Sequence, residues 1–210
     1  MTPDTWLAFV LASSVLLMIP GPTILLVMSY AISKGRSVAL ASAAGVALGD
    51  LLAMTASLAG LGALVLASAT AFSVLKWVGA AYLVYLGVKL LRSAREDSLA
   101  LPEAAQSVTP GGVFAHAAAV TALNPKSIAF FIAFVPQFIR PEAAILPQMA
   151  LLIATFVSLA TLNALAYALL ADRLRSLIAK PKALAWMTRT GGATLVAMGL
   201  LTATLKRATP

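Results

Sequence analysis

The sequence predicts an all-α integral membrane protein of six transmembrane helices, arranged as two inverted three-helix repeats. Of its 210 residues, 61% are hydrophobic and only 10% are charged, whereas a soluble domain has about 45–50% apolar and about 25% charged residues. The apolar residues also fall into runs long enough to cross a bilayer, which takes about 20 residues each. Too few charges remain to cover a globule in water, so lipid is the expected solvent.

Six apolar runs qualify as spans. They cover Trp6–Ile32, Val38–Leu66, Phe72–Leu91, Val113–Phe138, Leu146–Leu170 and Trp186–Leu205. The first contains Pro20-Gly21-Pro22 and the fourth contains Asn124-Pro125. Proline lacks the backbone N–H that continues a helix, and its ring clashes with the preceding turn. We therefore expect helices one and four to be broken in mid-span.

One connector is much longer than the others. Residues 92–112 read RSAREDSLALPEAAQSVTPGG, a polar segment with proline in it and charges at its start. This composition is typical of a linker. It divides the chain into a first three-helix unit at 1–91, a cytoplasmic linker at 92–112 and a second three-helix unit at 113–210.

The two units resemble each other. A shift of 113 residues places Asp50 on Asn163 and Lys76 on Arg189, and a shift of 103 places one broken-helix motif on the other. Three helices per unit is an odd number, so the second unit must be inverted relative to the first. Inverted repeats with paired discontinuous helices are a recurring feature of secondary transporters.

The distribution of basic residues predicts the orientation. One set of loops is richer in Lys and Arg, and such loops face the cytoplasm. That side holds Lys34, Arg36, Arg92, Arg95, Arg173, Arg175, Lys180 and Lys182. Both termini are therefore expected in the periplasm. The net charge of +8 is explained by this orientation, and we expect no nucleic-acid partner.

Several chemistries are absent from the sequence. There is no cysteine and only one histidine, His116, so neither a thiol relay nor a His-based metal cluster is expected. There is no GxxxxGK[ST] phosphate loop and no Ser–His or paired-carboxylate arrangement at membrane depth. We expect no enzyme activity, no cofactor and no bound metal.

Asp50 is the most informative residue. Apart from Asp50 itself, residues 37–75 carry no charge. A carboxylate in the middle of a membrane helix costs about 2.5–3.5 kcal/mol on insertion scales. A proton-coupling or ammonium-binding role is the functional interpretation. The alternative is a structural salt bridge or a protonated, hydrogen-bonded acid. A stripe of small residues, Ala41, Gly45 and Gly49, would let another helix approach the Asp50 face.

The broken helices supply the candidate substrate-binding residues. An unwound Pro20-Gly21-Pro22 segment, with Thr23 opening the next half-helix, would line a substrate site, or would simply kink the helix. In Asn124-Pro125-Lys126, followed by Ser127, the cation and helix N-terminus would attract an anionic group. Alternatively, Lys126 snorkels to the interface or pairs with Asp50. Asn163 would add hydrogen bonds to the substrate from helix five, or would form a structural hydrogen bond to a neighbouring helix.

This ordered set of motifs resembles the LysE/RhtB family of amino-acid exporters. The resemblance rests on Pro20-Gly21-Pro22, Gly35-Arg36, Gly45-x-x-x-Gly49-Asp50, Lys76-x-x-Gly79-Ala80-x-Tyr82-Leu83-x-x-x-Gly87-x-Lys89 and Asn124-Pro125-Lys126. It extends from Trp6 to about Leu205. It implies a small six-helix exporter of the bacterial inner membrane that runs on the proton gradient. The resemblance implies that Asp50 corresponds to the family's acid in helix two. It also implies that Pro20-Gly21-Pro22 and Asn124-Pro125-Lys126 correspond to the family's two broken-helix motifs.

The expected function is therefore secondary transport by proton antiport, exporting amino acids or closely related metabolites. The expected partners are that substrate, protons and the lipid bilayer, and a homo-oligomer is compatible with the sequence. Two alternatives stay open: a non-transporting membrane scaffold, and an exporter of another small solute such as a cation. Asp50 and Lys126 argue against a scaffold, which has no need of charges in its core.

Overall fold

The computed structural model describes residues 1–34, 38–67, 69–93, 109–140, 142–171 and 181–204, and within them it contains helices and no strand. The elements are α1 (Pro3–Met18), α2 (Pro22–Lys34), α3 (Ala39–Ala67), α4 (Ala69–Ser93), α5 (Pro110–Ala122), α6 (Pro125–Ala133), the short 3-10 helix η2 (Val135–Phe138), α7 (Ile145–Leu169) and α9 (Pro181–Thr204). The predicted all-α class is confirmed. Most of the predicted linker, residues 94–108, lies outside the described residues.

Both predicted breaks are present. The axes of α1 and α2 differ by 56°, and those of α5 and the segment 125–138 by 45°. By length and composition, α3, α4 and α7 can each cross a membrane, and each bent pair can form a further span, which gives three to five candidate spans. The sixth predicted span coincides with α9. Its five threonines and two cations make it less apolar than the other spans.

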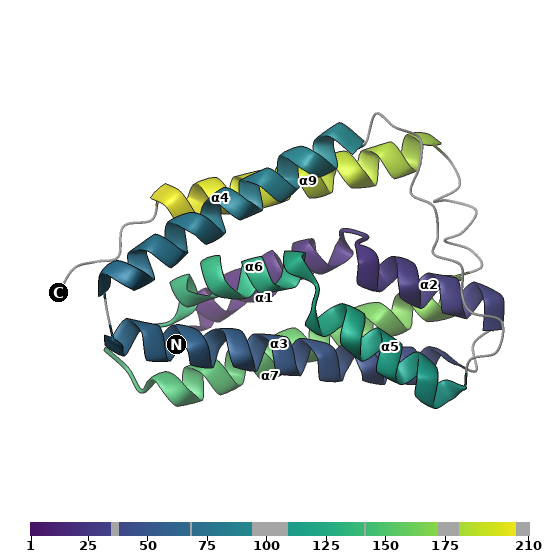
Figure 1. Cartoon of the computed structure of the whole chain (residues 1–210), viewed down its shortest axis with the longest axis horizontal. Helices are drawn as coiled ribbons and strands as arrows, with labels where there is room; N and C mark the ends of the chain where they lie inside the picture. The colour runs from purple at the N-terminus through teal and green to yellow at the C-terminus, as the bar shows by residue number, and fades with distance from the viewer. Residues whose placement is uncertain (35–37, 68, 94–108, 141, 172–180, 205–210) are drawn as a thin grey trace.

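Two layers of helices are visible in Figure 1. The helices α4 and α9 lie side by side along one edge, and the remaining helices form a bundle beneath them. The α4–α9 pair is antiparallel and very close: a Cβ atom at Gly192 would lie 2.7 Å from the carbonyl oxygen of Gly87, and one at Gly199 would lie 2.7 Å from that of Ala80. Small residues at such contacts let membrane helices pack backbone to backbone.

The small-residue stripe on α3 has the predicted effect. A Cβ atom at Gly49 would lie 2.6 Å from the carbonyl oxygen of Ala118, and one at Gly45 would overlap that of Phe114. The helix α5 therefore approaches α3 more closely than any larger side chain would allow. This contact brings the end of α5, and with it the second break, next to Asp50.

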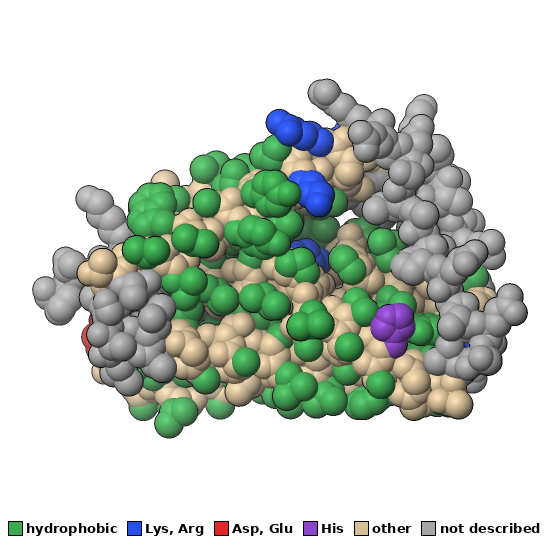
Figure 2. Space-filling view, in the orientation of Figure 1, with side chains coloured by type: hydrophobic (Ala, Val, Ile, Leu, Met, Phe, Trp, Pro, Cys, Tyr) green, Lys and Arg blue, Asp and Glu red, His purple; other side chains and the backbone are tan. Residues whose placement is uncertain are grey.

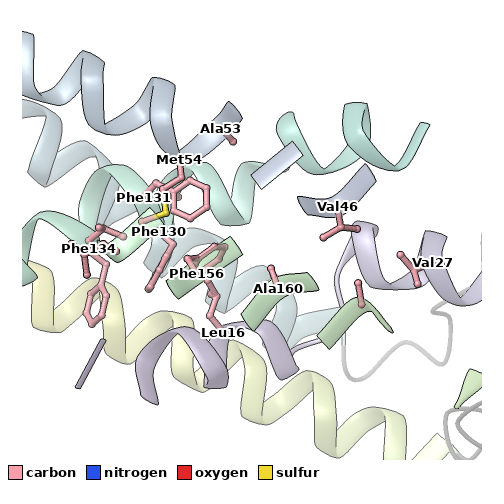
Figure 3. Packing of buried hydrophobic residues seen from close by; sticks show 14 of the residues in the cluster. Leu16, Val27, Val46, Ala53, Met54, Phe130, Phe131, Phe134, Phe156 and Ala160 are labelled. Atoms are coloured by element: carbon pink, nitrogen blue, oxygen red, sulfur yellow. The ribbon is translucent and has the colours of Figure 1, made fainter. Parts of the chain in front are cut away.

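An aromatic cluster fills the centre of the bundle. The rings of Phe131 and Phe156 meet edge to face with centroids 4.8 Å apart, and those of Phe130 and Phe134 stack at 5.4 Å. Figure 3 shows these rings from α6 and α7 beside Met54 of α3. Three residues belong both to this core and to the wall of the cavity described below: Leu16, Val46 and Ala160. The packed core thus supports one side of that cavity.

The outer surface is apolar. Figure 2 shows hydrophobic side chains spread across the visible face, with few charged groups among them. Leu11, Leu123 and Leu146 are exposed by 67%, 76% and 79%. Soluble monomers seldom expose contiguous apolar patches larger than a few hundred Å². Such a surface fits a protein that lies in a bilayer.

Candidate functional site

The two breaks meet at one cavity of about 20 Å³. Seven of the residues predicted from the sequence line it: Gly21, Thr23, Asp50, Asn124, Lys126, Ser127 and Asn163. The three prolines of the motifs do not line it, and their contribution is to end the helices there. Residues 100 or more positions apart in the chain therefore converge at one point.

The first break removes the usual backbone donors from two carbonyl groups of α1, although the Leu16 oxygen still accepts from the Ile19 N–H at 3.3 Å. In a continuous helix, Leu16 and Met18 would accept hydrogen bonds from the residues four positions on, but these are Pro20 and Pro22, which have no N–H. The Lys126 Nζ atom donates to the carbonyl oxygens of Leu16, at 3.2 Å, and Ile19, at 3.0 Å. Lys126 thus points inward, to the end of α1.

Two side chains of α7 satisfy the carbonyls between them. Asn163 Nδ2 donates to the carbonyl oxygen of Leu17 at 3.1 Å, and the Tyr167 hydroxyl donates to that of Met18 at 3.0 Å. Because they lie four residues apart, Asn163 and Tyr167 project from the same face of α7. Together with Lys126, they provide donors for all four terminal carbonyls of α1.

The second break is organised around Asn124. This residue is the N-cap of α6: its Oδ1 atom accepts from the backbone N–H of Lys126 at 3.0 Å, an arrangement that asparagine favours. Its Nδ2 atom donates to Thr23 Oγ1 at 3.1 Å, and the Thr121 hydroxyl also donates to Thr23 Oγ1 at 3.3 Å. Asn124 therefore caps its own helix and ties the second break to the start of α2.

Asp50 supplies the negative charge of the cavity. It is 3% exposed, and its Oδ1 atom has no hydrogen-bond partner. The direct Asp50–Lys126 pair, one of the arrangements considered for the empty site, is not formed through this oxygen. A buried charge without a partner is costly. The arrangement can therefore take up a proton, a cationic group or a change of partner.

Sequence reasoning missed Thr121 and Tyr167. A helical spacing would have found both, since Thr121 precedes Asn124 by three residues and Tyr167 follows Asn163 by four. Neither residue type is rare in an apolar helix, so nothing else in the sequence marks them. Within the described residues there is no group of three or more His, Cys, Asp or Glu residues that could hold a metal ion.

Comparisons with known proteins agree with the class of protein that this geometry suggests, a membrane translocator with two broken helices around a buried polar site. The chain belongs to the LysE type translocator family, whose model matches residues 14–205. It is 35% identical to the homoserine/homoserine lactone efflux protein of Salmonella typhimurium, over 99% of this chain and 100% of that protein. It is 32% identical to an uncharacterized membrane protein of Vibrio cholerae, over 96% and 97% of the two chains. It is also 32% identical to the leucine efflux protein of Salmonella choleraesuis, over 61% and 60%. No solved structure matches this chain.

Proposed function

We propose that this protein exports small α-amino acids and closely related derivatives from the cytoplasm, in exchange for protons. The observation that carries the proposal is the convergence of both helix breaks on one cavity that holds a buried carboxylate and an ammonium group. Discontinuous helices that meet near the midplane are where secondary transporters bind their substrates. The proposed location is the bacterial inner membrane.

The names of the relatives narrow the ligand class. Homoserine, its lactone and leucine have an α-ammonium group in common, whereas the lactone has no free carboxylate. We propose that the ammonium group is the primary recognition element and faces Asp50 and Asn163. When a carboxylate is present, Lys126 and the half-helix N-termini at Thr23 and Ser127 would hold it, because helix N-termini favour anions.

Six crossings in two inverted repeats form the proposed architecture. Gly87 contacts Gly192, and Ala80 contacts Gly199. Adding 113 to one residue number of the first pair and subtracting 113 from the other gives the second pair to within one residue. An inverted repeat requires this kind of exchange. In Figure 1, the start of α1 and the end of α9 lie toward the same end of the molecule, which an even number of crossings explains.

The same view supports the proposed orientation. The basic ends of α2 and α4, with Lys34 and Arg92, lie at the end of the molecule away from the start of α1. Because basic residues favour the cytoplasmic side, we propose that both termini lie in the periplasm. Several other basic residues of the predicted cytoplasmic side, including Arg36 and Arg95, lie outside the described residues.

Asp50 is the proposed proton carrier. A cavity of about 20 Å³ has room for about one water molecule, and an amino acid does not fit. Transport therefore requires the cavity to open alternately to each side of the membrane. A proton and a cationic substrate would compete for the Asp50 side of the cavity, as antiport requires.

Flux measurements in proteoliposomes test this function. Vesicles loaded with radiolabelled homoserine or leucine should release it faster when an inward-directed proton gradient is imposed, and a protonophore should remove the difference. Protein-free vesicles are the control. Release of an alkali cation without amino-acid release would favour the cation exporter, and no solute release above the control would favour the scaffold.

A further inference from the structure

We propose that the C-terminal end of α1 is an ammonium-binding subsite, which Lys126 occupies as an internal substitute until a primary-amine ligand displaces it. The proposal rests on the proposed function for the identity of the ligand, and it assigns the oxygen atoms that would bind the ligand's ammonium group. These are the carbonyl oxygens of Leu16 and Ile19. The bound ammonium group would also face Asp50, which lines the same cavity.

The subsite is defined by an ammonium group already bound to it. Lys126 Nζ lies 3.2 Å and 3.0 Å from the two carbonyl oxygens, and these distances are within the normal range for an N–H donor. The two prolines of the break remove the N–H groups that would bond Leu16 and Met18 in a continuous helix, and the Leu16 oxygen keeps one backbone donor, the Ile19 N–H at 3.3 Å. The end of a helix also carries a partial negative charge, which favours a cation.

A second observation points to a cationic ligand. Asp50 lines the same cavity, is 3% exposed, and its Oδ1 atom has no hydrogen-bond partner. The cavity therefore contains more acceptor capacity than Lys126 alone uses. With a ligand bound, the site would hold two ammonium groups. One would bind the carbonyl oxygens of Leu16 and Ile19, and the other would lie near the Asp50 carboxylate.

Gly21 borders this subsite. A Cβ atom there would lie 3.4 Å from Lys126 Nζ, which is ordinary contact, so only a side chain longer than that of alanine would crowd the ammonium group. Asn163 and Tyr167 hold the two intervening carbonyls of α1. These two bonds keep the end of α1 in place while its other two carbonyls exchange one ammonium group for another.

The exchange conserves the hydrogen bonds. A primary ammonium group has three N–H donors, as the lysine side chain has, and can replace Lys126 without leaving a buried carbonyl unpaired. An N-acylated amine has lost its charge, a quaternary ammonium has no N–H donor, and an α-hydroxy acid has no ammonium group. Lys126, once displaced, is free to bind the ligand's carboxylate or Asp50.

Chemical rescue of Lys126→Ala tests the subsite without requiring transport. In the purified full-length protein in lipid nanodiscs, methylammonium chloride should raise the midpoint of thermal unfolding of Lys126→Ala by about 2–4 °C or more. Tetramethylammonium chloride at the same ionic strength should not. Lys89→Ala, which removes an exposed cation of α4, is the matched control and should respond equally to both salts. Equal responses of Lys126→Ala to the two salts would overturn the proposal.

A ligand series on the wild-type protein provides a second test should Lys126→Ala fail to fold. Leucinamide and homoserine lactone, which have an ammonium group and no carboxylate, should shift the unfolding midpoint. N-acetylleucine and the α-hydroxy analogue of leucine should not, and stabilisation by these two compounds equal to that by leucinamide would reject the subsite. Parallel flux assays separate the two proposals: ammonium-specific binding without export would reject only the export function, and export of the hydroxy acid would reject only the subsite.

Discussion

The two breaks look equivalent in the sequence, yet they are stabilised in different ways. The second break is closed mainly by local bonds: Asn124 caps α6, and its own backbone N–H donates to the carbonyl of Thr121 at 3.1 Å. The first break has one local bond, from the Ile19 N–H to the Leu16 oxygen at 3.3 Å. Its other donors are side chains more than 100 residues away, namely those of Lys126, Asn163 and Tyr167.

This difference has a mechanistic consequence. A helix end that is capped from within its own segment keeps its cap whatever the neighbouring helices do. A helix end whose carbonyls are satisfied by other helices changes its bonds whenever those helices move. The first break is therefore the more suitable element for binding that is coupled to conformational change, and the second for a fixed support. The substitutions below test that comparison.

Asp50→Asn should have the largest effect on transport. In the predicted repeat, Asn163 is the counterpart of Asp50, so this change would make the two predicted units alike at this position. An amide cannot carry a proton. We expect gradient-driven export to be lost, at least about tenfold, while equilibrium exchange of labelled substrate across the vesicle membrane continues. Uphill export at the wild-type rate would place the coupling group elsewhere.

Lys126→Ala should come next, because it removes the donor to two carbonyls at the first break. Unsatisfied buried polar groups cost about 1–3 kcal/mol, and water entering the enlarged polar cavity limits the loss of stability to about that range. Export should also fall, but by less than in Asp50→Asn, measured in the same vesicles with the amount of inserted protein normalised. Lys126→Arg, which keeps the charge and the donors, should retain more stability than Lys126→Ala.

Gly49→Ala tests whether close α3–α5 packing is needed to bring the second break to Asp50. The added Cβ would lie 2.6 Å from a backbone oxygen of α5, so the helices must separate, at a cost of about 1–3 kcal/mol. Gly60→Ala is the matched control on the same helix, because a Cβ there meets no atom within 4 Å. Equal thermal unfolding midpoints for the two variants would contradict the packing.

The smallest effects are expected at the caps, and they separate the two breaks. Asn124→Ala should cost about 1 kcal/mol, and Tyr167→Phe about 0.5–1.5 kcal/mol, the usual contribution of one hydrogen bond. Amide hydrogen exchange should distinguish them: Asn124→Ala should increase exchange mainly at the start of α6, and Tyr167→Phe at the end of α1 and in α7. Tyr85→Phe, at an exposed position of α4, is the control. Identical exchange patterns in the two variants would remove the distinction between the breaks.

Much of this molecule could be predicted from the sequence because lipid simplifies the problem. In a bilayer, a long apolar run has little alternative to a helix, since every backbone group must be paired within the segment. The motifs Pro20-Gly21-Pro22 and Asn124-Pro125 then indicate the breaks, and a lone carboxylate such as Asp50 stands out against an uncharged background. The membrane class, the two breaks, the small-residue stripe and the broken-helix motifs all follow from local composition and spacing.

The tertiary structure decided which atoms meet. The sequence places Lys126 beside the second break, but only the fold shows that its ammonium group binds the carbonyls of the first. The same holds for Asn163 and for Tyr167, which no local signal distinguishes from ordinary helix residues. The physical reason is that the partners are backbone carbonyls, which every residue has. What made four of them available was a proline break, and what brought donors to them was the packing of α6 and α7 against α1.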